Sequence, residues 1–231
     1  MRKITNTLTA QKVNIQAIKS LLIPAGFVIL LWIILLIQKI FDLDFPYELG
    51  LYPRSFSKIT GIITSPLIHA GYAHLFSNSL PIFFLAAGII YFYPETAFKV
   101  ISIIYIFTGL LVWLFARGVY HIGASGLIYG FAAFLFFSGI FKRDNRSIGL
   151  ALLVTFLYGG MVWGILPGQP GISWESHLFG GLIGIVSAFI FRKKDKHYRY
   201  EWEKEESEVP PDKLEISYDK DKQNKDESDE I

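Results

Sequence analysis

Three separated stretches of an otherwise apolar chain hold polar residues whose types and spacing could do chemistry. They read "HAGYAHLFSN" over 69–78, "GASG" over 123–126 and "SHLFGGLIG" over 176–184. A serine hydroxyl becomes a nucleophile when a neighbouring base removes its proton, and an imidazole, with an ordinary pKa of about 6.5, suits that task. Ser125 and His177 therefore form a candidate Ser-His dyad for acyl transfer.

The elements that must bring these residues together are membrane-spanning helices. Hydrophobic residues make up 52% of the 231 residues, which indicates a membrane protein. A helix needs roughly 20 apolar residues to cross a hydrocarbon layer of about 30 Å. Six such runs occur, approximately over 21–40, 73–93, 97–116, 125–141, 148–166 and 177–191. We therefore predict an all-α membrane protein with six transmembrane helices.

The ends of the chain differ in composition from this apolar part. Residues 21–191 form the predicted six-helix domain, and residues 1–20 form a short segment before it. Residues 192–231 are dominated by Lys, Asp and Glu, so we expect a charged, disordered tail. The loop "PGQPGISWES" before the last helix contains two prolines and should be irregular.

The distribution of positive charge predicts the orientation in the membrane. Basic residues precede the first run, separate the fourth from the fifth, and follow the sixth. With an even number of helices these places share one side, and Lys and Arg in short loops mark the cytoplasmic side. We expect both termini in the cytoplasm and an integral multi-pass protein of a prokaryotic plasma membrane.

In this orientation the second, fourth and sixth helices all run from the outside to the inside. Asn78, Ser125 and His177 lie near their outer ends. At about 1.5 Å of rise per residue, each lies about 21–24 Å from the inner end of its helix. In a core of about 30 Å, the three residues share a level some 6–9 Å below the outer surface.

Close approach of two helices is the second requirement of a dyad. Gly126 and Gly130 follow Ser125, while Gly180 and Gly184 follow His177. Faces of small residues four apart let helix backbones pack tightly in lipid. We therefore expect the fourth and sixth helices to touch beside the reactive residues.

Acyl transfer also needs hydrogen-bond donors for the developing oxyanion. His74 and Asn78 are spaced i, i+4 on one helix face, and both side chains can donate. The backbone N–H of Ser125, at a helix start, adds a further donor. Tyr129 lies one turn after the serine, where its ring could pack on His177 and hold its orientation.

Other interpretations of the polar residues remain. Glu175 lies outside the helical face of His177 and is expected to be a solvated loop residue. His121 is expected to be an ordinary interfacial residue. His69 could cap the helix that follows it, Ser125 could be only a capping residue, and Asn78 only an interhelical hydrogen bonder.

Two further classes of protein are weighed against a serine hydrolase. The histidines could hold zinc, but no HExxH spacing and no carboxylate within a helix accompanies them, and the chain has 0 cysteines. A transporter or channel should carry polar residues across the whole membrane, whereas here they gather in the outer half.

The three stretches, in this order and with Tyr129 four residues after the serine, resemble the rhomboid family of intramembrane serine proteases. The resemblance covers all six predicted helices. It implies a six-helix fold that cleaves single-pass transmembrane proteins at or within the bilayer without a cofactor. No nucleic-acid partner is expected, and the oligomeric state stays open.

Residue by residue, the resemblance implies Ser125 as nucleophile and His177 as base. His74 and Asn78 would form the oxyanion hole, and His69 would be structural or water-retaining. Three further residues would support the site: Tyr129, Gly123 and Gly126.

The sequence departs from the family pattern in the first loop. The family's Trp-Arg pair is here Tyr52-Pro53-Arg54, which puts the packing of that loop in doubt. The alternative to a protease is a non-catalytic rhomboid-like protein that binds transmembrane helices for quality control. Loss of the serine or of the base would mark such a protein, and both residues are present.

Overall fold

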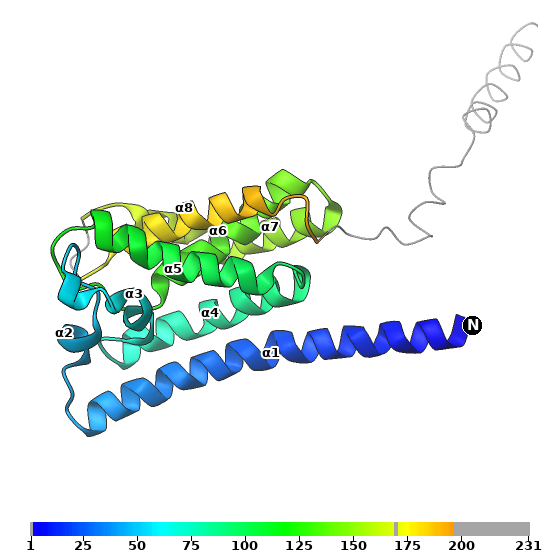
Figure 1. Ribbon diagram of the computed structural model, residues 1–231. Helices are drawn as coiled ribbons and strands as arrows, with labels where there is room; N and C mark the ends of the chain where they lie inside the picture. Colours follow the sequence, from blue (N-terminus) through cyan, green and yellow to red (C-terminus); the bar gives the residue numbers. More distant parts are fainter. Residues whose placement is uncertain (1, 169–170, 196–231) are drawn as a thin grey trace, which may run out of the picture. The chain divides into compact units, whose positions relative to one another are not determined.

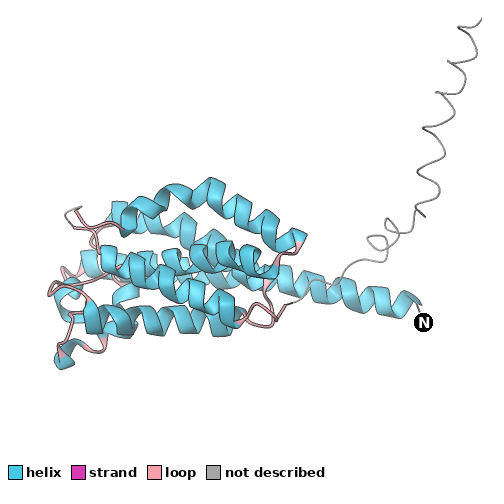
Figure 2. Ribbon diagram, turned by 90° about the horizontal axis from the view of Figure 1, so that it is seen from above, coloured by secondary structure: helices cyan, strands magenta, loops and turns pink. Residues whose placement is uncertain are grey.

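The computed structural model of the chain describes residues 2–168 and 171–195, and these residues are helical with short connections (Figures 1 and 2). The α-helices are α1 (Arg2–Ile40), α2 (Phe45–Leu49), α3 (Gly61–Thr64), α4 (Tyr72–Phe92), α5 (Ala97–Phe115), α6 (Ser125–Lys142), α7 (Asn145–Tyr158) and α8 (Trp174–Ile190). Three 3₁₀ segments accompany them: η1 (Phe56–Lys58), η2 (Ser65–Leu67) and η3 (Gly159–Ile165).

The long helices have the length and apolarity of membrane spans. Five candidate spans are found in the described part of the chain, at 15–40, 72–92, 97–115, 125–142 and 145–165. Helix α8 is equally apolar but has 17 residues. The predicted all-α membrane fold is confirmed, and the number of six crossings stays a prediction.

Two predicted helix boundaries differ from those in the structure. Helix α1 begins at Arg2, so it runs without a break through the residues that we assigned to a separate first segment. The fifth predicted helix is α-helical only to Tyr158 and continues as the 3₁₀ segment η3. The predicted disordered tail falls, from residue 196 onward, outside the described residues.

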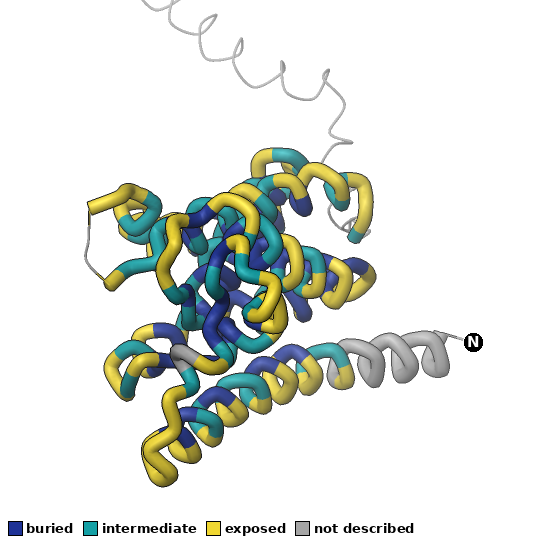
Figure 3. The backbone as a smooth tube through the Cα atoms, turned by 60° about the vertical axis from the view of Figure 1, so that its left-hand side comes forward, coloured by how far each residue is buried: buried dark blue, intermediate teal, exposed yellow. Residues whose placement is uncertain are grey.

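Helix α6 is the centre of the bundle. It packs against α4, α7 and α8, while α5 packs on α8 and α1 lies along α4 (Figure 1). Fully buried apolar side chains gather where α4, α5 and α6 meet, and Figure 3 shows this buried interior inside an exposed outer layer. Many exposed residues are large and apolar, such as Phe156, which is 86% exposed. This pattern fits helices whose outer faces lie against lipid.

The contact between α6 and α8 is made backbone to backbone through glycines. A Cβ atom added at Gly180 would lie 2.0 Å from the carbonyl oxygen of Gly126, and one at Gly184 would lie 2.2 Å from that of Gly130. No side chain fits in this space. The predicted contact between the fourth and sixth helices is confirmed, and it brings the amino-terminal ends of α6 and α8 together.

Replacing Gly180 by alanine is expected to lower the free energy of unfolding by about 1–3 kcal/mol, because the added methyl group forces the two helices apart. The matched control is Gly181→Ala, since a Cβ at the next residue meets nothing within 4 Å. Thermal unfolding in detergent micelles measures both variants. Equal melting temperatures for the two variants would contradict the close packing.

The first long connection closes the end of α5. The Arg54 guanidinium donates to the carbonyl of Ala116 at 2.7 Å, and the Arg54 backbone N–H donates to the carbonyl of Trp113 at 2.8 Å. The Tyr52 hydroxyl donates to the carbonyl of Gly118 at 3.0 Å. Carbonyls at a helix end lack partners within the helix, so these donors satisfy them. The loop packs firmly on α5 although a proline separates its tyrosine from its arginine.

Candidate functional site

Ser125 and His177 meet at the amino-terminal ends of α6 and α8. The distance from Ser125 Oγ to His177 Nε2 is 2.8 Å, and the other ring nitrogen, Nδ1, lies 2.8 Å from the carbonyl oxygen of Gly164. A carbonyl can only accept a hydrogen bond, so Nδ1 carries the hydrogen of the neutral ring. Nε2 is then the acceptor for the serine hydroxyl, which is the tautomer that a general base requires.

Tyr129 supports the imidazole from one side. Its ring stacks on that of His177, with centroids 4.1 Å apart and planes inclined by 8°. Its hydroxyl donates to the carbonyl of Met161 at 2.6 Å, in η3. Segment η3 therefore supplies two backbone acceptors, one to the tyrosine and one, through Gly164, to the histidine.

Sequence reasoning missed these backbone partners. Met161 and Gly164 act through carbonyl groups, which every residue has, so their side-chain types carry no chemical signal. The one available signal is the glycine itself: a Cβ at Gly164 would lie 2.0 Å from the Tyr129 hydroxyl oxygen and 3.3 Å from His177 Nδ1.

His74 and Asn78 lie against the loop that leads to Ser125. A Cβ at Gly123 would lie 2.7 Å from His74 Cε1, 2.8 Å from His74 Nε2 and 3.8 Å from Asn78 Nδ2. Gly123 also has φ of +99°, a conformation that L side chains rarely adopt. Glycine is thus required here both for the turn and for the close approach of the His74 ring.

The Asn78 amide is a buried donor. The Asn78 side chain is 5% exposed, and its Nδ2 has no hydrogen-bond partner among the described residues. Leaving a buried donor unpaired costs about 1–3 kcal/mol. Such a group can donate to an acceptor that enters the site.

His69 contacts the loop that leads to Ser125. It is 1% exposed, its Nε2 accepts a hydrogen bond from the Ala124 backbone N–H at 3.4 Å, and its ring meets His74 edge-on at 5.0 Å. Burial, followed by the nearby His74, lowers the pKa of His69 to about 4. A neutral imidazole at this position can accept the Ala124 hydrogen bond at neutral pH.

Glu175 is not the solvated loop residue that we expected. It is 3% exposed, and its carboxylate lies 3.1 Å from the Arg117 guanidinium, which also donates to the carbonyl of Ile172 at 2.6 Å. The expectation is wrong because the connection between α5 and α6 folds against the start of α8. Arg117, 58 residues earlier in the chain, thereby reaches Glu175.

His121 is likewise buried rather than interfacial, with 2% of its surface exposed. Its Nδ1 is hydrogen-bonded to the Ser173 hydroxyl, and its Nε2 lies 3.2 Å from the carbonyl oxygen of Arg117. Burial lowers the pKa of His121, so the ring is neutral at neutral pH. His121 and Arg117 together tie the α5–α6 connection to the residues that precede α8.

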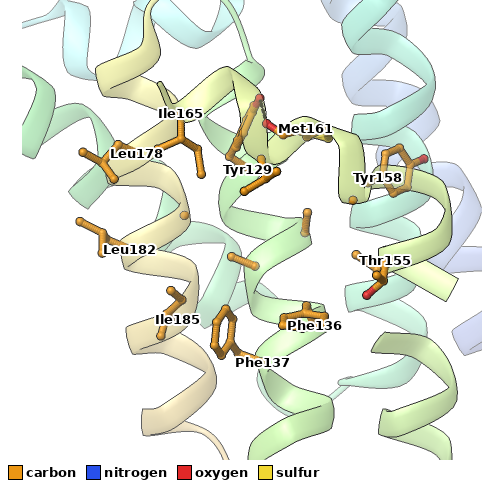
Figure 4. A pocket seen from close by; sticks show the side chains of 16 residues that line it. Tyr129, Phe136, Phe137, Thr155, Tyr158, Met161, Ile165, Leu178, Leu182 and Ile185 are labelled. Atoms are coloured by element: carbon orange, nitrogen blue, oxygen red, sulfur yellow. Dashed lines mark hydrogen bonds between the residues drawn. The ribbon is translucent and has the colours of Figure 1, made fainter. Parts of the chain in front are cut away.

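The dyad opens into a cavity of about 780 Å³. Ser125, His177, His74 and Asn78 all line it. A second, apolar groove of about 420 Å³ lies between α6, α7 with η3, and α8 (Figure 4). Among the described residues, no group of three or more His, Cys, Asp or Glu side chains is arranged to hold a metal ion.

Comparison with known proteins finds a family match over the part of the chain that contains the site. The family model named Rhomboid domain matches residues 57–194, which include α4 to α8 and every residue of the site. An uncharacterized protein of Mycobacterium tuberculosis is 36% identical over 187 residues, covering 75% of each chain.

Two further relatives cover somewhat less. An uncharacterized protein of Mycobacterium leprae is 34% identical over 148 residues, which is 60% of this chain and 59% of that protein. A Bacillus subtilis protein that bears the name "Putative rhomboid protease YdcA" is 28% identical over 149 residues, 59% of this chain and 70% of that protein. The family model alone spans more than half of the chain, and the chain therefore belongs to the rhomboid family.

Proposed function

We propose that the chain is an intramembrane serine endopeptidase, which hydrolyses peptide bonds in or next to the transmembrane segments of single-pass membrane proteins. The observation that carries the proposal is the 2.8 Å hydrogen bond between Ser125 Oγ and His177 Nε2, with the hydrogen of the ring on Nδ1. A serine hydroxyl in this relation to an imidazole can lose its proton as it attacks a carbonyl carbon.

The proposed reaction proceeds in two steps. Ser125 Oγ attacks the peptide carbonyl while His177 Nε2 takes its proton, and the C–N bond breaks as Nε2 gives that proton to the leaving amine. Water then attacks the acyl-enzyme ester and transfers a proton to Nε2. The ester C–O bond breaks, the proton returns to Ser125 Oγ, and one water molecule has been consumed without any cofactor.

Both steps pass through a tetrahedral oxyanion. We assign its stabilisation to His74, to the Asn78 amide and to the backbone N–H of Ser125, which begins α6 and has no partner within the helix. Donors fixed in a largely buried site need no rearrangement when the charge forms.

The position of the site constrains the substrate. The dyad lies at the start of two apolar helices, so water should reach it through the cavity from the outer face, with both termini in the cytoplasm. A transmembrane substrate must unwind locally, because a helical peptide bond is engaged in its own hydrogen bonds. Residues that destabilise a helix should favour cleavage near them.

Active-site titration with a fluorophosphonate tests the proposal. We expect the reconstituted protein to cleave a labelled single-pass substrate, and the fluorophosphonate to form one adduct, on Ser125. Cleavage should fall in proportion to the labelled fraction measured by mass spectrometry. Cleavage that persists after complete labelling would reject Ser125 as nucleophile. Tight binding of a panel of transmembrane helices without cleavage would instead favour the non-catalytic alternative.

A further inference from the structure

We propose that η3 decides whether the dyad is competent, because the main-chain carbonyl of Gly164 is the group that orients His177. Gly164 is thus a positioning residue, in the place that a carboxylate takes in a Ser-His-Asp triad. This inference rests on the proposed function. It adds that peptide-bond cleavage requires η3 to be docked on α6 and α8.

Three contacts join η3, Tyr129 and His177 into a closed set. Gly164 accepts from His177 Nδ1 at 2.8 Å, Met161 accepts from the Tyr129 hydroxyl at 2.6 Å, and the two rings stack at 4.1 Å. Figure 4 shows Tyr129 of α6 reaching the η3 backbone beside Met161. The orientation of the imidazole therefore depends on where η3 lies.

The fit is tight at Gly164 and loose at the other two glycines of the segment, Gly159 and Gly160. A Cβ at Gly164 would meet the Tyr129 hydroxyl oxygen at 2.0 Å and its Cζ at 3.1 Å. At Gly160 a Cβ would meet nothing within 4 Å. Among the three glycines of η3, the close fit is thus found at the one whose carbonyl accepts from His177.

Segment η3 lies at the outside of the bundle. Of the most apolar 18 residues in the span made of α7 and η3, 17% are buried, against 28% in α5, 44% in α4 and 50% in α6, and η3 contains no buried residue. It also lies between two spaces: Met161 of η3 lines both the catalytic cavity and the apolar groove, together with Tyr129 of α6 and Tyr158 of α7. A segment without a buried residue can be displaced at lower cost than a helix of the buried core.

Displacement of η3 would disable the base. Without the Gly164 carbonyl, the hydrogen of the neutral imidazole can reside on Nε2, and this tautomer cannot accept the proton of Ser125. A substrate helix that pushed η3 aside would therefore find an incompetent dyad. We infer that η3 is docked again, or was never displaced, when the peptide bond is cleaved.

The test compares Gly164→Ala with Gly160→Ala, each in the full reconstituted protein. For Gly164→Ala we expect kcat to fall by about 10–100-fold, as for a catalytic group misplaced by about 1 Å, with little change in KM. The rate of Ser125 labelling by a small fluorophosphonate should fall by a similar factor, since that reagent needs no access for a helix. Gly160→Ala should stay within about threefold of the parent in both rates.

Two additional measurements separate orientation of the base from a loss of structure. A carbonyl acceptor stabilises the imidazolium more than the neutral ring, so the acid limb of the pH–rate profile of Gly164→Ala should move to lower pH. Tyr129→Phe removes the hydroxyl that collides with the new methyl group and adds no atoms. The double variant Gly164→Ala/Tyr129→Phe should therefore label faster than Gly164→Ala alone.

The outcomes are distinguishable from failure of the proposed function. If Gly164→Ala slows cleavage of the helical substrate but has the same labelling rate and pH profile as the parent, η3 serves only substrate access and the inference is wrong. An unchanged labelling rate and pH profile in Gly164→Ala would overturn it as well. If Ser125→Ala cleaves as fast as the parent, the proposed function itself fails.

Discussion

Ser125→Ala and His177→Ala are each expected to reduce kcat by about 10⁴-fold or more, and the double variant should be no slower than the slower single one. The nucleophile and its base act as one unit, so removing either residue leaves the other unable to contribute to catalysis. Single-turnover cleavage of a labelled transmembrane substrate by reconstituted protein measures all three variants.

Ser176→Ala is the matched control for the dyad variants. Ser176 immediately precedes His177, but its hydroxyl is hydrogen-bonded to that of Ser173 at 2.6 Å rather than to the dyad. We expect its kcat to stay within about threefold of the parent and all variants to keep the parent's melting temperature. Multiplicative losses in the double variant, or near-parental activity of His177→Ala, would show that another group is the base.

The pairing of Ser125 with His177 could be predicted because lipid restricts where polar residues can be placed. The two residues are 52 positions apart, yet each begins an apolar run and each is followed by glycines at helical spacing. Burying polar side chains in hydrocarbon is costly unless they face a partner or a cavity. The ends of the second, third, fourth and sixth predicted helices lie close to those of α4, α5, α6 and α8 for a similar reason, since the thickness of the bilayer sets the length of a span.

The partners of the dyad could not be predicted in the same way. Gly164 and Met161 contribute backbone carbonyls, and whether a carbonyl is free depends on the helix ending in 3₁₀ geometry after Tyr158. The adjacent glycines at 159 and 160 only hint at that change.

The misjudged Glu175 and His121 illustrate a different limit. His121 pairs with Ser173, and Glu175 pairs with Arg117. In each pair one residue lies in the α5–α6 connection and the other lies at or just before the start of α8. Which of these residues become buried depends on how the α5–α6 connection folds over the start of α8. Hydrophobic periodicity carries no information on that path, because it describes helices and not the connections between them.

Asn78→Ala is expected to lower kcat by about 10²–10³-fold while leaving KM nearly unchanged. The reason is that Asn78 Nδ2, which has no hydrogen-bond partner in the described part of the chain, would donate only to the oxyanion that forms during reaction. Ser77→Ala, in the same turn of α4, is the control, since the Ser77 hydroxyl donates to the carbonyl of His74 and should not be needed for catalysis. Steady-state cleavage of the labelled substrate gives both constants. A rise in KM at constant kcat would assign the Asn78 amide to substrate binding, and an unchanged kcat/KM would remove it from the oxyanion hole.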